Sequence, residues 1–240
     1  MTVDSIAAHH LEYNWTFKSM LLEPSQAVEA VKLLHEAVET NSAPIAGPRG
    51  AEDFDPNRYL DALPHLRLPD GYCLDYYYWK TASSGAPWIY AREVSRPPCS
   101  DLGERGKANG CFEPLELLMP DGSCDSWFEL ELFRRIAGQF RLSWHAAYFD
   151  FQFVTDPDTL ERILTTHAYG MKPGFVDQAK RLETTVAVTK SGKGVTLEYL
   201  GFSKWKGFTR HLERISRRPP YDVLESKSAQ HLAWHCGVRF

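Results

Sequence analysis

The sequence predicts an α+β fold in which a mostly antiparallel, twisted sheet of hairpins carries an N-terminal helix on one face. Apolar and polar residues alternate in three successive runs between residues 126 and 156, and a period of two is typical of strands with one buried face. Aromatic residues make up 13% of the 240-residue chain and pack well on a pleated, half-buried surface. One stretch near the N-terminus repeats its apolar residues at helical spacing instead. Such a sheet can also curl toward a barrel or a sandwich.

The N-terminal helix is expected over residues 25–40. Its apolar residues share one face, and most of its charged residues lie on the other. Ser25 suits the N-cap, because its hydroxyl can accept a backbone N–H group. The apolar stripe needs a surface to pack on, and the aromatic sheet is the expected one. The stripe contains Ala27, Val31, Leu34 and Val38.

The three alternating runs of residues 126–156 are expected to form an antiparallel meander, because the breaks between them are too short for a crossover helix. A register that keeps the aromatic residues together on one face brings the polar residues together on the other. This polar face is expected to carry Glu129, Glu131, Arg141, Ser143, His145, Asp150 and Gln152.

Further elements follow from local patterns of apolar spacing and of turn residues. We expect helices over residues 56–63 and 156–166, a strand over residues 112–119, and an alternating C-terminal run over residues 231–240. Two hairpins are also expected, one pairing residues 72–80 with 87–94 and the other pairing residues 184–189 with 195–200. Residues 1–240 are predicted to form a single domain, and a division near the Pro- and Gly-rich residues 41–70 is the alternative.

One short pattern occurs twice, as LRLPDGYC at residues 66–73 and as LLMPDGSC at residues 117–124. Pro-Asp-Gly forms turns for physical reasons, since proline presets one backbone angle and glycine tolerates positive φ. That chemistry alone can produce the likeness. A duplicated turn-plus-hairpin unit is the other explanation, and it would place Cys73 and Cys124 in equivalent positions.

Composition indicates an ordinary globular protein, with 43% hydrophobic and 24% charged residues. A net charge of −4 gives no general attraction to nucleic acid or to anionic membranes, so we expect neither as a partner. The N-terminus has no secretory signal pattern, which favours a soluble, cytoplasmic protein. The five cysteines are odd in number and form no CxxC pair, which favours reduced thiols over a disulfide framework.

A hydrolytic site is one interpretation of the polar meander face. His145 and Asp150 would be cross-strand neighbours, so that the carboxylate could orient the imidazole. Arg141, Glu129 and Glu131 complete the candidate catalytic set. Ser143 would lie about 7 Å along the strand from His145, too far for a nucleophile bonded to its base. The plainer interpretation is a solvated face with cross-strand ion pairs.

A metal site is the second candidate, built on His231 and His235 with Cys236, and completed by His145 or Asp150. The pattern lacks the glutamate of an HExxH motif, so it is weakly specific. No cofactor is identified by the sequence.

A basic and aromatic segment near residues 204–218 is the third candidate, and it suits a binding surface for an acidic partner or for phosphates. Its proposed binding residues are Lys204, Trp205, Lys206 and Arg210.

The sequence therefore favours a non-enzymatic binding protein that uses an aromatic-rich antiparallel sheet and long polar loops to hold a protein partner or a small ligand. A metal-dependent or His/Asp-based hydrolase is the alternative. Burial of the polar meander face would favour the enzyme, and exposure would favour the binding protein.

Overall fold

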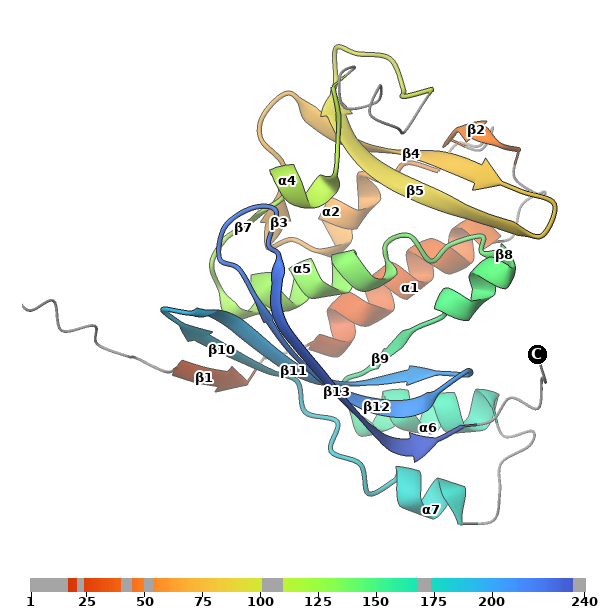
Figure 1. Ribbon diagram of the computed structural model, residues 1–240, viewed down its shortest axis with the longest axis vertical. Helices are drawn as coiled ribbons and strands as arrows, with labels where there is room; N and C mark the ends of the chain where they lie inside the picture. Colours follow the sequence, from red (N-terminus) through yellow and green to blue (C-terminus); the bar gives the residue numbers. More distant parts are fainter. Residues whose placement is uncertain are drawn as a thin grey trace, which may run out of the picture.

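The strands described by the computed structural model form a six-stranded, a five-stranded and a two-stranded sheet (Figure 1). The model describes residues 17–20, 24–39, 45–49, 54–100, 110–167 and 174–234. Every strand pair in these ranges is antiparallel, and helices pack between and beside the sheets, so the predicted α+β class is confirmed. The sheets are open and do not close into a barrel.

The six-stranded sheet is centred on β11 (Gly194–Ser203). One edge of β11 pairs with β12 (Gly207–Ile215), which pairs in turn with β13 (Val223–Ala233). The other edge is shared end to end by β10 (Ala187–Ser191) and β9 (Gln152–Val154), and β1 (Phe17–Met20) extends the sheet beyond β10. The hairpin predicted to pair residues 184–189 with residues 195–200 is therefore confirmed, with its first strand beginning at Ala187.

The five-stranded sheet is built on the hairpin of β4 (Tyr72–Lys80) and β5 (Ser84–Glu93). This hairpin agrees with the prediction for residues 72–94. Three two-residue strands add to it: β2 (Gly47–Pro48), β6 (Cys111–Phe112) and β8 (Ser143–Trp144).

The two Pro-Asp-Gly segments begin at strands that pair with each other, β3 (Leu66–Arg67) and β7 (Met119–Pro120). In both turns the glycine has positive φ, +83° at Gly71 and +89° at Gly122, as the turn chemistry requires. The first turn leads into β4 and the second leads into a helix, so Cys73 and Cys124 are not in equivalent places. A duplicated hairpin is therefore wrong, and turn chemistry explains the likeness.

Two helices agree with the sequence pattern almost to the residue: α1 (Pro24–Glu39) and α6 (Pro157–Thr166). The N-cap predicted at Ser25 is wrong, because α1 already begins at Pro24 and Ser25 lies inside its first turn. Asp156 caps α6, since its Oδ1 accepts the Thr159 N–H at 2.6 Å. The strand expected over residues 112–119 is wrong, because Pro114 starts the short helix α4 (Pro114–Leu117) after only two strand residues. Two further short helices are α2 (Arg58–Ala62), inside the range predicted for a helix, and α7 (Phe175–Ala179).

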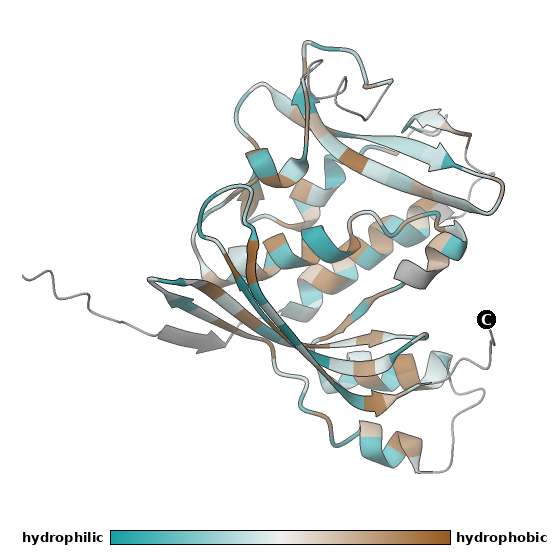
Figure 2. Ribbon diagram, viewed as in Figure 1, coloured by the Kyte–Doolittle hydropathy of each residue, from teal (hydrophilic) through white to brown (hydrophobic). Residues whose placement is uncertain are grey.

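The meander predicted for residues 126–156 is wrong, because residues 124–136 form the helix α5 (Cys124–Ile136). Helix α5 lies in a middle layer with α1, between the β4–β5 hairpin and the six-stranded sheet (Figure 1). Figure 2 shows hydrophobic and hydrophilic residues interleaved along α5. A helix enclosed on all sides needs no polar face, and its residues Trp127, Phe128, Glu129, Leu130, Glu131 and Leu132 are all buried.

The six-stranded sheet is covered on both faces. Leu197 and Tyr199 of β11 belong to the main core with α1 and α5, whereas Leu200 and Phe202 pack with α6 and α7 in a second core. This change of partner follows from strand alternation, because odd and even residues of β11 point to opposite faces.

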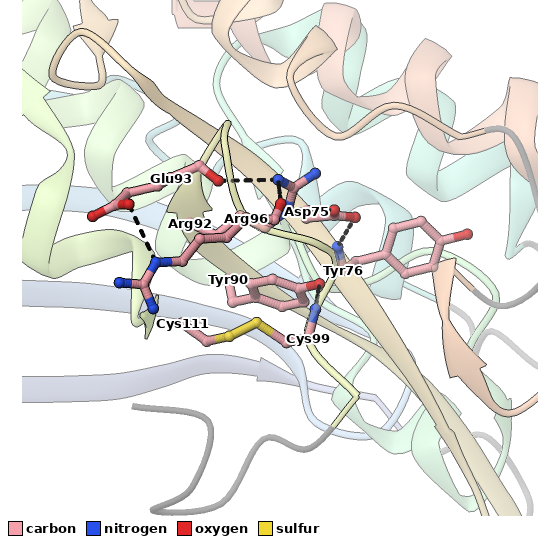
Figure 3. The surroundings of a disulfide bond; sticks show 8 residues. All are labelled: Asp75, Tyr76, Tyr90, Arg92, Glu93, Arg96, Cys99 and Cys111. Carbon is pink, nitrogen blue, oxygen red and sulfur yellow. Dashed lines mark hydrogen bonds and ion pairs between the residues drawn. A yellow bond between two sulfur atoms is a disulfide. The ribbon is translucent and has the colours of Figure 1, made fainter. Parts of the chain in front are cut away.

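A disulfide joins Cys99 to Cys111, and its Cα atoms are 6.5 Å apart. Figure 3 shows it beside the ring of Tyr90, whose hydroxyl accepts the Cys99 N–H at 2.8 Å. The prediction of reduced thiols is wrong for this pair, because chain folding, and not spacing, brings the two cysteines together. Cys73 and Cys124 are free, and Cys236 lies outside the described residues.

None of the helices in the described ranges combines the length and the apolar character needed to cross a lipid bilayer.

Candidate functional site

The five residues proposed as catalytic do not lie on one face. Glu129 and Glu131 are buried on α5. Arg141 is also buried, and its Nε and Nη2 donate to the Val38 carbonyl at 3.0 and 2.6 Å. His145 is exposed at the start of the 3₁₀ helix His145–Phe149, and Asp150 follows that helix instead of pairing across a strand. The arrangement that suggested catalysis is therefore not found, and the chemical role of each residue stays a prediction.

The proposed metal ligands are only partly described. His231 lies exposed on β13, whereas His235 and Cys236 lie outside the described residues. Among the residues that the structure does describe, no three His, Cys, Asp or Glu side chains come together as a metal site.

The proposed basic segment is divided between two faces of the six-stranded sheet. Lys204, Trp205 and Lys206 form the turn between β11 and β12, and Trp205 Nε1 donates to the Ala147 carbonyl at 3.0 Å. Arg210 lies on the face of the sheet that packs on α6 and α7. There its Nε donates to Glu198 Oε1 at 3.1 Å, and its Nη1 and Nη2 donate to backbone carbonyls. Of the four, Lys206 lines a cleft.

That cleft, called here the sheet cleft, has a volume of about 470 Å³. It lies on the face of the six-stranded sheet that packs on α5, beyond the C-terminal end of that helix. Paired residues of β11, β12 and β13 form its floor, because they share one side of the sheet in the observed register. The floor contains Gly201, Ser203, Thr209, His211, Ser228 and Gln230.

Arg135, at the C-terminal end of α5, forms one wall of the sheet cleft. Its Nε donates to Glu131 Oε1 at 2.9 Å and its Nη2 pairs with Glu213. Arg134 pairs with the same two carboxylates, and Tyr199 donates its hydroxyl to Glu131 Oε1 at 2.6 Å. This buried network fixes the guanidinium of Arg135 in position at the cleft.

Phe151 lies beside Arg135 in the same wall, and its ring lies on the backbone of Gly201. The Arg135 guanidinium carbon is 5.3 Å from the centre of the Phe151 ring, a cation–π distance. His211 stacks on Tyr199 with ring centroids 5.2 Å apart. Burial lowers the pKa of His211 to about 4, with a further contribution from Arg135, so this imidazole is neutral near pH 7. Burial also raises the pKa of Asp150, whose carboxyl group lines the same cleft.

The glycine at position 201 is expected to be required for the position of Phe151. A Cβ atom there would lie 2.4 Å from Phe151 Cζ, so Gly201→Ala must displace the ring. We expect the free energy of unfolding, measured by urea denaturation, to fall by about 1–3 kcal/mol.

The matched control is Gly192→Ala, where a Cβ would meet nothing within 4 Å and the change is expected to stay within about 0.5 kcal/mol. Combining Gly201→Ala with Phe151→Leu should cost less than the sum of the two single changes. Strict additivity would show that the ring does not depend on this glycine.

Sequence reasoning missed four residues of the sheet cleft: Arg135, Phe151, Gly201 and His211. One available signal was Gly201 itself, since a glycine within a strand marks a close approach of another group. The position of Arg135 had no comparable signal, because its partner Glu213 is 78 residues away in the chain.

Comparisons with protein-family models, curated proteins and solved structures found no match to this chain.

Proposed function

We propose that this chain is a non-enzymatic binding protein and that the sheet cleft holds a small, flat ligand with one anionic group. The observation that carries this proposal is the Arg135 guanidinium, fixed by two buried carboxylates and set against Phe151 at the wall of the cleft. A ligand ring can stack on the same aromatic wall, and preorganised groups lose little entropy on binding.

The charges of the lining favour an anionic group over a cationic one. Arg135 and Lys206 are cations, and Asp150 is the single acidic residue in the part of the lining that the structure describes. Burial raises the pKa of Asp150, so its negative charge is disfavoured there. Neutral donors on the sheet floor, Ser228 and Gln230 among them, can satisfy further polar atoms of the ligand.

Benzoate is the probe for this proposal, because it combines one ring with one carboxylate. Titration followed by NMR is expected to shift the amide signals of Gly201, Thr209 and His211. Lys206→Gln should weaken benzoate binding about threefold to tenfold, since it removes one charged contact of about 0.6–1.4 kcal/mol.

Lys227→Gln is the matched control. This lysine is 71% exposed on β13 and pairs with Leu212, so it points to the face away from the cleft. Benzylammonium tests the sign of the charge and should bind more weakly than benzoate. Equal binding of the two probes, or equal effects of the two lysine changes, would refute an anion site here.

The hydrolase alternative depends on His145 and Asp150 acting together as cross-strand neighbours, whereas these two residues lie at opposite ends of a 3₁₀ helix. The geometry therefore supports binding better than hydrolysis.

A further inference from the structure

A second cleft, of about 710 Å³, opens between α1, α2 and the first half of α5. We call it the acidic cleft. Its apolar walls include Ala27, Ala30, Ala62 and Phe128. Its charged lining is almost entirely acidic, with Asp61, Asp125 and Glu129. Among the described lining residues, His65 is the single basic one.

Glu129 differs from the other buried carboxylates of the described chain. Asp75 pairs with Arg49 and Arg92, and both Glu131 and Glu213 pair with the two arginines of α5. Glu129 is only 4% exposed, yet it forms no ion pair with any described residue. Its Oε2 accepts the backbone N–H of His65 at 2.8 Å, and no described donor reaches its Oε1.

The imidazole of His65 offsets the charge of Glu129 only in part, because it forms its ion pair with Asp121, whose Oδ2 is 2.8 Å from His65 Nδ1. Asp121 and Asp125 add negative potential at Glu129, and Asp61 faces the same cleft from α2. Burial is the main reason that the pKa of Glu129 rises to about 7, and the two aspartates contribute to the rise. A buried carboxylate without a cation is costly unless it is protonated or a ligand supplies the charge.

We propose that the acidic cleft binds a small alkylammonium ligand, whose charged nitrogen pairs with Glu129 and whose carbon chain lies along Phe128 and the alanines. The apolar walls favour an organic cation over a metal ion, and within the described residues no cluster of metal ligands forms. This site is separate from the sheet cleft and does not depend on the function proposed for it.

The direct test is calorimetric titration of the full chain with n-butylammonium chloride at pH 8, where Glu129 is ionised. Glu129→Gln keeps the size of the side chain and an acceptor for the His65 N–H group, and it is expected to weaken binding at least tenfold. Asp177→Asn is the control, because this exposed residue of α7 lies beyond the other face of the six-stranded sheet. It removes the same formal charge and should leave the affinity unchanged.

Two further probes define the ligand. Neutral n-butanol should not compete, since it lacks the charge. A lysine with blocked amino and carboxyl termini tests the source of the ammonium group: binding as tight as that of butylammonium would indicate a protein side chain, and much weaker binding would indicate a free amine.

The pH dependence follows from Glu129, with Asp61, His65, Asp121 and Asp125 as the other titratable groups near it. Affinity for butylammonium should fall as the pH drops below about 7, because the ligand must displace a proton from the carboxyl group.

The folding of the variant can be checked independently. The pKa of Glu129 is higher in the folded protein than in the unfolded chain, so its ionisation destabilises the fold as the pH rises through 7. Glu129→Gln should therefore raise the midpoint of thermal unfolding at pH 8 and change it less at pH 5. A folded Glu129→Gln protein that binds butylammonium as tightly as the parent chain would overturn the proposal.

Discussion

Glu131→Gln is expected to lower the free energy of unfolding by about 3–5 kcal/mol, because it removes one carboxylate from a buried network and leaves arginines without full compensation. Glu131 is completely buried, at 0% exposure. It accepts hydrogen bonds from Arg134, Arg135 and Tyr199. A glutamine of the same size keeps the packing but cannot balance two guanidinium charges. Urea denaturation at pH 7 measures the loss.

The control for this change is Glu161→Gln. Glu161 also pairs with a cation, Lys180, at 3.0 Å, but both side chains are more than half exposed. A solvated pair contributes about 0–1 kcal/mol, so the control should cost no more than that. Similar losses for the two substitutions would show that the buried network adds nothing beyond a surface ion pair.

Gly207→Ala is expected to destabilise the chain by about 2–4 kcal/mol, through backbone strain and a direct clash. Gly207 has φ +84°, a region that L residues rarely adopt. A Cβ atom there would lie 2.2 Å from the Leu232 carbonyl oxygen and 2.4 Å from the Trp234 nitrogen. Both are backbone atoms at the end of β13, so neither can move aside without disturbing the pairing of β12 with β13. Chemical denaturation gives the cost.

Gly122→Ala separates the two causes. Its φ of +89° is nearly the same, but a Cβ there would meet nothing within 4 Å. It should therefore show only the backbone cost of about 1–2 kcal/mol. If Gly207→Ala costs no more than Gly122→Ala, the close approach of β13 is not a constraint on the fold.

Helix α5 connects the two candidate clefts. Glu129 lines the acidic cleft, and Arg135, about one and two-thirds turns further along the helix, lines the sheet cleft. Glu131 lies between them and pairs with Arg135 and Arg134. The helix therefore places an unpaired carboxylate in one cleft and a fixed cation in the other.

Local sequence signals predicted the elements whose stabilising contacts are close in the chain. Helix α6 has Asp156 as its cap, and α1 has a clear apolar stripe. The β4–β5 hairpin has a short turn in which Thr81 Oγ1 accepts the N–H groups of Ser83 and Ser84. Each of these features is complete within a few residues, so neighbouring side chains determine the backbone.

Helix α5 shows where such reasoning fails. Its alternation of Phe128, Leu130 and Leu132 with two glutamates resembles a half-buried strand. The helix signals were present, with Ser123 accepting the Ser126 N–H as the N-cap and with two arginines in the last turn. The strand prediction was preferred over these helix signals because it assumed that polar residues face water.

Local patterns in the sequence are enough to predict the α+β class, helices α1 and α6 and the two hairpins, because local hydrogen bonds and apolar periodicity fix these elements. Long-range packing determines the rest: it encloses α5 as a helix between two sheets, brings Cys99 to Cys111, and places charged residues in each cleft. Whether a charged residue can be buried depends on its ion-pair partner, and that partner can lie far away in the chain. Glu131 can be buried because Arg135 neutralises it, and Arg135 is held by Glu213 from a distant strand, whereas no described side chain forms an ion pair with Glu129.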